Sequence, residues 1–233
     1  MRKACLLLIS LLLLLSAPVS AAEEAVPSPG WAAAIGRALG VEQLAVVSAL
    51  GGPQALFSLH ERDAAGNWHV VVSTHAFIGE NGLGKTRTGD KKTPRGVFPL
   101  NTAFGIEDDP GSVLPYHKVT EYDYWSGDYY HYNQMVDIRD YPALDPRACE
   151  HLIDIEPQYR YCLNIGYNAE GDTGAGAAIF LHCMKPGKEY TAGCVAIPEQ
   201  DMIAVLRHVG ENSRIVIEEM DLLLSAERLP AGS

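Results

Sequence analysis

The pattern of apolar and polar positions along the chain predicts a β-rich fold. Three runs of strand-like composition follow one another closely, at residues 43–50, 54–61 and 67–78. The turn sequence Gly51-Gly52-Pro53 joins the first two, and the polar segment 63–67 joins the second to the third. Because strands this close in sequence pair with their neighbours, the pattern predicts an antiparallel meander.

Further elements are predicted on both sides of this meander. Residues 31–39 have the apolar spacing of a short amphipathic helix that ends at Gly40. Pro198 favours the start of a second helix, because proline suits the first helical turn. In chain order, we expect a glycine-rich segment at 79–96, an apolar run at 96–100, strands at 162–166 and 177–183, a helix at 198–208 and a strand at 214–218. Together they predict a mostly β, single-domain, β-sandwich-like fold with a few short helices.

The segment 104–142 has little regular periodicity and is dense in aromatic side chains. A long irregular stretch inside a compact domain is often functional, so one hypothesis makes it a lid or the wall of a substrate groove. The other makes it a structural loop packed by its own rings. The aromatic residues concerned are Tyr122, Tyr124, Trp125, Tyr129, Tyr130 and Tyr132.

The first 22 residues have the features of a secretory signal peptide. Arg2 and Lys3 give the positive start, the apolar run 4–15 has the length of a signal core, and residues 19–21 fit a small-x-small cleavage site. That run is short for a membrane anchor, and no later segment is long and apolar enough to cross a bilayer. We therefore expect export to the periplasm or cell wall, without stable membrane insertion after cleavage.

The rest of the chain divides into a lead with a short helix at 23–42, one domain at 43–220 and a surface tail at 221–233. The hydrophobic content of 47% and charged content of 20% are those of a soluble globular protein. The net charge of −11 argues against nucleic acid and against an anionic membrane surface as partners.

Four cysteines follow the predicted leader. In an oxidising compartment an even number of cysteines favours disulfides. Cys149 and Cys162 lie close together in sequence, so we expect a disulfide between them. Cys183 and Cys194 need a different explanation.

The segment 179–199 has a pattern typical of cysteine catalysis. His182 ends a predicted strand, a turn-rich connector follows, and residues 191–194 read Thr-Ala-Gly-Cys. The thiolate is the reactive form of cysteine, and a nearby imidazole produces it by taking the proton. Gly193 lets the backbone turn tightly, so that N–H groups can face a developing oxyanion. The alternative is a buried cysteine that lies near a histidine without any chemistry.

This segment resembles the active-site motif of the L,D-transpeptidase family, the YkuD-type catalytic domain. In that family a strand-borne His precedes a variable connector and then Ser or Thr, any residue, Gly and Cys; His182 and residues 191–194 match this order. A second block, residues 89–98, reads GDKKTPRGVF and is similar to the family's GD..TP.G.F element. The resemblance spans roughly residues 43 to 220 and implies a YkuD-type fold.

The resemblance implies acyl transfer on peptidoglycan stem peptides, with no metal or organic cofactor. Cys194 attacks the bond between meso-diaminopimelate and D-Ala, and His182 activates the thiol. An amine of a neighbouring stem then takes the acyl group to give a 3–3 cross-link, or water takes it in a carboxypeptidase reaction. Backbone N–H groups at Gly193 and its neighbours form the oxyanion hole.

Further residues take positioning roles under the same resemblance. The carbonyl of Cys183 orients His182, while the Cys183 side chain points into the core because side chains alternate along a strand. Thr191 belongs to the motif. Many members carry Arg or Asn two positions after the Cys, where this chain has Ala196, so we expect Arg95 or Lys85 to bind a substrate carboxylate instead.

Other functions stay open beside this one. A sortase-like transpeptidase would use His131, Cys194 and Arg207, although Thr-Ala-Gly before the Cys lacks that family's apolar pattern. A non-catalytic peptidoglycan-binding module would have the same fold, although such a module would be expected to lack the His or the Cys. Metal binding by His182, Cys183 and Cys194 is disfavoured, because neighbours on a strand point to opposite sides.

The remaining polar residues receive structural interpretations. We expect His60 and His75, in strand patterns, to be structural or at the surface. His117 and His131 lie in the aromatic segment, where contact with substrate is possible. Asp90 and Thr93 are expected to shape their loop, since Asp and Thr are natural turn builders.

Overall fold

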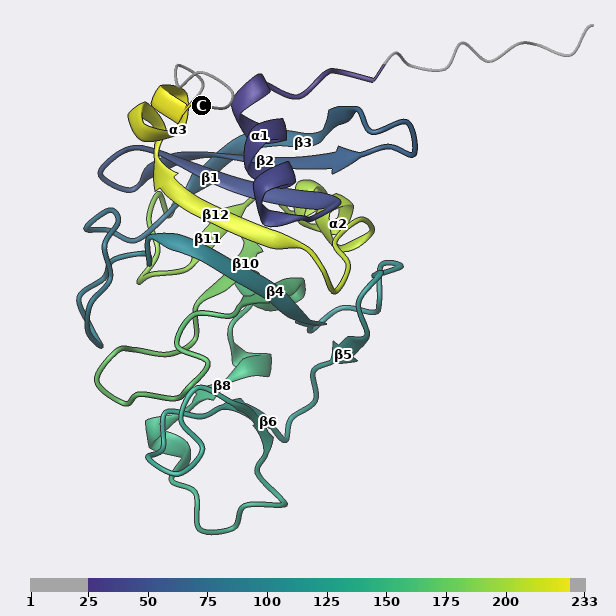
Figure 1. Cartoon of the computed structure of the whole chain (residues 1–233). Coiled ribbons are helices and arrows are strands. Elements are labelled where there is room, and N and C mark those ends of the chain that lie inside the picture. Colours follow the sequence, from purple (N-terminus) through teal and green to yellow (C-terminus); the bar gives the residue numbers. More distant parts are fainter. Residues whose placement is uncertain (1–24, 227–233) are drawn as a thin grey trace, which may run out of the picture.

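The structure, a computed structural model, describes residues 25–226 (Figure 1). The predicted signal peptide therefore lies outside the described residues, as does the end of the tail. In chain order the elements are α1 (Gly30–Leu39), β1 (Gln43–Gly51), β2 (Gln54–Arg62), β3 (Trp68–Phe77), β4 (Gly96–Gly105), β5 (Tyr116–Lys118), β6 (Asp123–Trp125), β7 (Met135–Asp137), η1 (Pro146–Ala148), β8 (Glu150–His151), η2 (Leu152–Asp154), η3 (Gln158–Arg160), β9 (Cys162–Ile165), β10 (Phe180–Cys183), β11 (Val195–Ile197), α2 (Glu199–Leu206), β12 (Arg214–Glu219) and α3 (Met220–Ala226).

The antiparallel meander predicted from the sequence is confirmed. Strand β1 pairs with β2, and β2 pairs with β3, both antiparallel. These strands belong to a nine-stranded sheet with the order β12-β1-β2-β3-β11-β10-β9-β4-β5. The mostly β, single-domain prediction is therefore also confirmed, with short helices at its margins.

The main sheet closes on itself. Strand β12, first in this order, pairs in parallel with β1 and antiparallel with β4, which is next to last. The two layers are thus one continuous sheet rather than two separate ones, and apolar side chains fill the space between them. Helix α2 adds Met202, Val205 and Leu206 to this inner core. Its strand-borne members include Val47, Phe57, Leu59, Leu100, Leu163, Leu181, Val195, Ile215 and Ile217.

A second apolar cluster lies on the outside of β1 and β12, under α1 and α3 (Figure 1). Trp31 of α1 and Leu223 of α3 both pack there, with exposed fractions of 7% and 4%. The predicted helix end at Gly40 is confirmed, since this residue has a left-handed φ of +67°. The first part of the predicted surface tail belongs to helix α3, which packs on the outer face of the sheet through Leu223.

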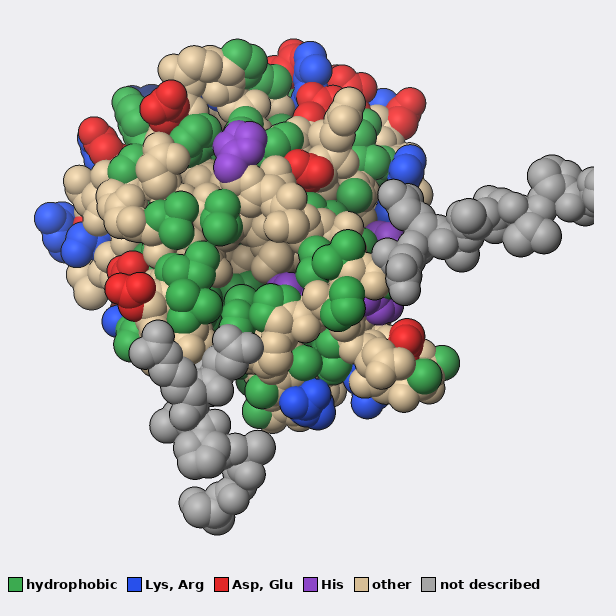
Figure 2. Space-filling view, turned by 90° about the horizontal axis from the view of Figure 1, so that it is seen from above, with side chains coloured by type: hydrophobic (Ala, Val, Ile, Leu, Met, Phe, Trp, Pro, Cys, Tyr) green, Lys and Arg blue, Asp and Glu red, His purple; other side chains and the backbone are tan. Residues whose placement is uncertain are grey.

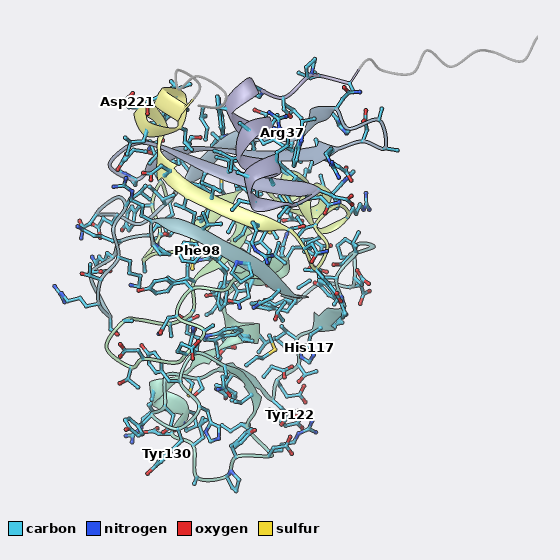
Figure 3. All side chains as sticks on the ribbon, in the orientation of Figure 1. Arg37, Phe98, His117, Tyr122, Tyr130 and Asp221 are labelled. Carbon is cyan, nitrogen blue, oxygen red and sulfur yellow. The ribbon has the colours of Figure 1, made fainter. Side chains whose placement is uncertain are left out.

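The aromatic segment belongs to a distal lobe, residues 119–161, drawn at the bottom of Figure 1. Strands β7, β6 and β8 form a small three-stranded sheet in it. Trp125 is buried against Phe180 of the main sheet, with ring centroids 4.7 Å apart. Tyr130, by contrast, is 83% exposed and lies at the far end of the lobe (Figure 3). Some aromatic rings of the segment therefore pack in the interior, whereas others are exposed at the surface.

Two predicted strands have different limits in the structure. The run 177–183 becomes a strand only from Phe180, because Ala178 has a left-handed φ of +56° that no strand accommodates. The apolar run 96–100 is the first half of β4, which continues to Gly105. The early bend at Ala178 matters for the site described below.

The surface agrees with the mixed charge of the sequence. On the face seen from above, acidic and basic side chains are interspersed around the rim (Figure 2). Among residues 25–226, no helix has the length and apolar character to cross a membrane.

Candidate active site

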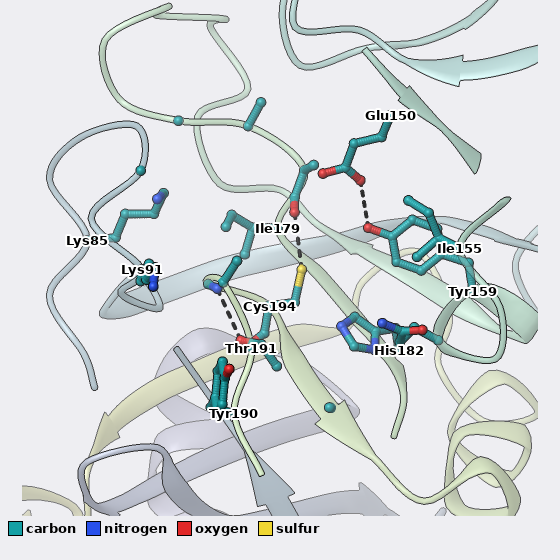
Figure 4. Close-up of a pocket in the computed structure, with 18 of the residues that line it drawn as sticks. Lys85, Lys91, Glu150, Ile155, Tyr159, Ile179, His182, Tyr190, Thr191 and Cys194 are labelled. Atoms are coloured by element: carbon teal, nitrogen blue, oxygen red, sulfur yellow. Dashed lines mark hydrogen bonds between the residues drawn. The ribbon is translucent and has the colours of Figure 1, made fainter. Parts of the chain in front are cut away.

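A cavity of about 440 Å³ lies between the main sheet and the distal lobe. Cys194 and His182 both line it (Figure 4). The lobe contributes Glu150, Ile155, Gln158 and Tyr159 rather than its aromatic segment, since no residue of the described stretch 104–142 is part of the lining. His117 and His131 are therefore not brought to this cavity.

Parallel pairing of β10 with β11 brings the two motif residues together. His182 lies opposite Ala196, and Leu181 lies opposite Val195. Cys194 immediately precedes β11, so the connector between the strands returns the chain to the imidazole. This crossover explains how residues twelve positions apart in sequence come to share one cavity.

Hydrogen bonds within the Thr-Ala-Gly-Cys turn fix its shape. The Thr191 hydroxyl donates to the Cys194 carbonyl at 2.6 Å and accepts from the Gly193 N–H at 3.1 Å. Gly193 has a φ of +150°, and a Cβ there would lie 3.0 Å from the Lys92 carbonyl. Glycine is thus required both by conformation and by the close approach of another loop. Its N–H is engaged by Thr191, so it does not face the cavity as an oxyanion donor.

The second motif, residues 89–98, contacts this turn through the side chain of Thr93. Thr93 is fully buried; its hydroxyl donates to the Cys194 carbonyl at 3.3 Å and accepts from the Gly79 N–H at 2.8 Å. The two sequence motifs therefore meet at one carbonyl. This geometry agrees with the expectation that Thr93 shapes the loop.

Asp90 organises the glycine-rich loop. Burial opposes ionisation of its carboxyl, but the N–H groups of Thr86, Lys92 and Arg87 and the Lys85 ammonium hold its pKa well below the usual range. The Lys85 Nζ lies 3.0 Å from Asp90 Oδ1, and both side chains are almost entirely buried. Lys85 thus lines the cavity as a member of a buried ion pair.

The Cys194 thiol lies between two backbone groups. Its Sγ donates to the Ala178 carbonyl at 3.2 Å, and the Phe180 N–H donates to Sγ at 3.4 Å. Burial raises the pKa of the thiol to about 12, against a smaller lowering by the Phe180 N–H. The thiol is therefore neutral at physiological pH in this structure.

The His182 imidazole has a defined tautomer. Its Nδ1 lies 2.8 Å from the Cys183 carbonyl, which can only accept, so Nδ1 carries the proton and Nε2 is the basic nitrogen. Burial lowers the pKa of His182 to about 4; the hydrogen bond to the Cys183 carbonyl opposes this shift, and the charge of Lys188 adds to it. A neutral imidazole thus lies in the same cavity as a neutral thiol.

The Cys183 side chain points away from the cavity. Its Sγ is in the inner core and donates to the Tyr161 carbonyl at 3.6 Å. Cys183 therefore offers His182 only its backbone carbonyl, as the strand alternation predicted. Across residues 25–226, no group of three His, Cys, Asp or Glu side chains is arranged to hold a metal ion.

The residues of the sortase-like alternative are not assembled. The His131 ring lies 4.2 Å from the Tyr141 ring in the distal lobe. Arg207, at the end of α2, donates to the Pro110 carbonyl at 2.8 Å. Neither residue lines the cavity that contains Cys194.

Arg95 is likewise absent from the cavity. Its Nε donates to Glu218 at 2.8 Å on the surface of the main sheet. Of the two cations expected to face substrate, only Lys85 is in the lining. Arg95 immediately precedes β4, and its side chain is directed to Glu218 of β12 rather than to the cavity.

The expected Cys149–Cys162 disulfide is not formed. All four cysteines in the described chain are free. Cys162 belongs to β9 and is buried in the aromatic cluster, whereas the Cys149 Sγ is 3.5 Å from the Asp145 carbonyl in the distal lobe. Proximity in sequence was a poor guide, because β8 and two 3-10 turns separate the two residues.

Several residues at the site had no distinguishing sequence signal. Asn133 Oδ1 accepts from the Ala178 N–H at 3.0 Å and from Trp125 Nε1 at 3.0 Å, and so supports the bend that presents the Ala178 carbonyl to Cys194. Tyr159 packs edge-on to His182, with ring centroids 5.7 Å apart. An isolated Asn or Tyr in a loop is too common for its sequence alone to have indicated these contacts.

Histidines outside the cavity have structural partners. His60 is buried, and its ring nitrogens contact the hydroxyls of Ser28 and Ser58 at 2.9 and 2.8 Å. Burial lowers its pKa to about 4. His117 contacts Asp123 at 3.0 Å.

Comparison with known proteins agrees with this geometry. The family model described as the L,D-transpeptidase catalytic domain (YkuD) matches residues 54–217. The chain belongs to this L,D-transpeptidase family. The matched range includes both sequence motifs, residues 89–98 and the segment from His182 to Cys194.

The other comparisons add little. No curated protein matches the chain. Among solved structures it is similar to an L,D-transpeptidase from Mycobacterium smegmatis, with 12% identity and a TM-score of 0.34, covering 76% of this chain. The chain spans 58% of that protein's length.

Proposed function

We propose that the protein is a cysteine L,D-transpeptidase that cleaves the meso-diaminopimelate–D-Ala bond of peptidoglycan stem peptides. The observation that carries this proposal is the shared cavity of Cys194 and His182, with the imidazole tautomer fixed by the Cys183 carbonyl. Membership of the family supports the substrate class.

The charge of the cavity supports an anionic substrate. Although the chain has a net charge of −11, four lysines line the cavity, and Glu150 is the only acidic residue in the lining among residues 25–226. Lys85 and Lys91 are paired with Asp90 and Glu80. The other two, Lys185 and Lys188, form no ion pair with a described residue, and they are the cations that can bind stem-peptide carboxylates in place of the side chain missing at Ala196.

In the first half-reaction, His182 Nε2 takes the thiol proton and Cys194 Sγ attacks the carbonyl carbon of the diaminopimelate residue. Because Gly193 N–H is engaged, the N–H of Cys194 is the donor we assign to the oxyanion. The buried imidazolium is a strong acid, since burial lowers the pKa of His182 to about 4. It therefore protonates the D-Ala amine readily as the C–N bond breaks and the thioester forms.

In the second half-reaction, an amine of another stem or a water molecule attacks the thioester. It gives a proton to His182 Nε2, and that proton returns to Sγ as the C–S bond breaks. The product is a cross-linked dimer in the first case and a tripeptide in the second. The Phe180 N–H, 3.4 Å from Sγ, stabilises the departing thiolate.

The test is to incubate the protein with disaccharide-tetrapeptide muropeptides and follow the products by mass spectrometry. We expect loss of D-Ala that disappears in Cys194→Ala. Cross-linked dimers indicate transpeptidation, and tripeptides indicate carboxypeptidation. His182→Ala should also lose turnover, because His182 is the base that we assign to the thiol proton. D-Ala release that persists in Cys194→Ala overturns the nucleophile assignment.

We also propose that the protein is exported and acts in the periplasm or cell wall. The apolar run 4–15 after Arg2 and Lys3 supports this proposal. N-terminal sequencing of the protein from the envelope fraction should give a chain that begins near Ala22. An intact N-terminus in the cytoplasmic fraction would contradict it.

A further inference from the structure

One side of the cavity carries hydrogen-bond acceptors that the proposed chemistry does not use. Glu150, on β8, is the one acidic residue that the described part of the chain contributes to the lining. Its Oε2 accepts from the Tyr159 hydroxyl at 2.7 Å. In Figure 4 this carboxyl lies across the cavity from Lys85, with its other oxygen turned away from Tyr159.

The second carboxylate oxygen has no hydrogen-bond partner among the described residues. A carboxylate can accept several hydrogen bonds, so one contact from Tyr159 leaves most of its capacity unused. Burial raises the pKa of Glu150, and the Tyr159 hydroxyl acts in the opposite direction. A carboxyl that is largely shielded from water gains most from a ligand that is both cationic and rich in N–H donors.

A second acceptor in the same lining points to the same kind of ligand. The side-chain Oε1 of Gln158 is buried and has no hydrogen-bond partner in the described structure. Gln158 also lines the cavity. Buried acceptors are nearly always satisfied, and an unsatisfied one costs about 1–3 kcal/mol, so Gln158 is a second candidate to receive a hydrogen bond from a ligand.

We propose that Glu150 and Gln158 form a binding site for a primary ammonium group of the substrate. A primary ammonium has three N–H donors and one positive charge, which match the free oxygens of both side chains and the carboxylate charge. The site rests on the proposed function, and it adds selection for a substrate that carries an amine as well as carboxylates. Lys185 and Lys188 meet the carboxylates, and Glu150 and Gln158 meet the amine.

Two groups of the proposed substrates carry such an ammonium. One is the side chain of the donor's diaminopimelate residue, whose carbonyl is attacked. The other is the amine of the acceptor stem. The chemistry of recognition is the same for both, and the two are separated by experiment.

The test compares two tetrapeptide donors in the wild type and in Glu150→Gln. The second donor has its side-chain amine replaced by hydrogen and keeps every carboxylate. We expect the wild type to lose about 10- to 100-fold in kcat/KM on losing the amine, as for a buried charged hydrogen bond. Glu150→Gln should treat both donors alike, because glutamine can still accept from Tyr159 but carries no charge.

A matched control isolates the role of the position. Glu189→Gln removes the same charge from an exposed residue near the rim that does not line the cavity, so it should keep the wild-type preference. Gln158→Met should weaken the preference without abolishing it. If Glu150 only supports the packing of Tyr159 against His182, Glu150→Gln will lower kcat/KM for both donors by the same factor. The wild-type preference for the donor with the amine is then retained, and this result overturns the proposal.

The two ammonium sources differ in their dependence on acceptor. A preference in hydrolysis assays, without acceptor amine, assigns the site to the donor side chain. A Glu150-dependent rise in KM for the acceptor amine alone assigns it to the acceptor. The site is excluded if Glu150→Gln keeps the wild-type donor preference in hydrolysis and also leaves the KM for the acceptor amine unchanged.

A binding measurement keeps this proposal separate from the proposed function. Calorimetry with Cys194→Ala, which cannot turn over, measures the affinity for each donor with and without Glu150→Gln. If the wild type releases no D-Ala, the proposed function fails, yet an amine preference that depends on Glu150 in binding still supports the ammonium site. Equal affinity for both donors, together with no Glu150 effect on acceptor KM, overturns it.

Discussion

Replacing Thr93 with valine tests how the two motifs support each other. Valine has nearly the shape of threonine but cannot form hydrogen bonds. The Thr93 side chain is fully buried and satisfies the Gly79 N–H at 2.8 Å. In Thr93→Val this N–H loses its only side-chain acceptor in a buried position, whereas the Cys194 carbonyl keeps the hydrogen bond from Thr191.

The expected loss of unfolding free energy follows from that single unsatisfied donor. A buried N–H without an acceptor costs about 1–3 kcal/mol. For a domain of this size, a loss of about 2 kcal/mol lowers the melting temperature by about 4–8 °C. Urea unfolding followed by tryptophan fluorescence, together with calorimetry, measures both quantities.

Thr74→Val provides the matched control. Thr74 is half-buried on β3, and its hydroxyl makes no hydrogen bond to another described residue. The same chemical change there should alter the unfolding free energy by less than about 0.5 kcal/mol. If Thr93→Val costs no more than Thr74→Val, the Thr93 hydroxyl does not hold the loop, and our account of the second motif is wrong.

Three further predictions concern the cysteines and the turn. The rate of Cys194 alkylation by iodoacetamide should rise about tenfold per pH unit between pH 7 and 9, because burial raises the thiol pKa to about 12; a plateau below pH 7 would reveal a preformed thiolate instead. Gly193→Ala should abolish turnover and destabilise the protein, since a Cβ would lie 3.0 Å from the Lys92 carbonyl at a φ of +150°, and full activity in that variant would disprove the required close approach. Thiol titration of the unfolded, unreduced mature protein should find four free cysteines, and a count of two would restore the Cys149–Cys162 disulfide.

The neutral state of both reacting groups has a consequence for the timing of catalysis. Burial raises the pKa of the Cys194 thiol and lowers that of the His182 imidazole. Both shifts disfavour a thiolate–imidazolium pair before substrate binds. The thiol instead donates to the Ala178 carbonyl at 3.2 Å. For the proposed reaction we therefore expect proton transfer to His182 to accompany attack on the substrate carbonyl, when the developing oxyanion and the imidazolium appear together.

The sequence alone indicated most of the local elements and the two candidate reacting groups. The period of the apolar residues gave the meander of 43–78 and the first helix, because burial on one side of a strand or helix imposes that period. The order of His182 and residues 191–194 indicated the nucleophile and the base, because cysteine chemistry requires an imidazole and a tight turn near the thiol. Strand alternation was enough to direct the Cys183 side chain into the core.

The tertiary structure decided which distant residues share the cavity. Closure of the sheet through β12, the place of Glu150 in the cavity and the exclusion of Arg95 all depend on pairing between segments far apart in sequence. The bend at Ala178 depends likewise on Asn133, forty-five positions earlier. Such contacts leave no periodic trace in the chain, because they are set by side-chain packing and hydrogen bonding that form only once the sheet has closed.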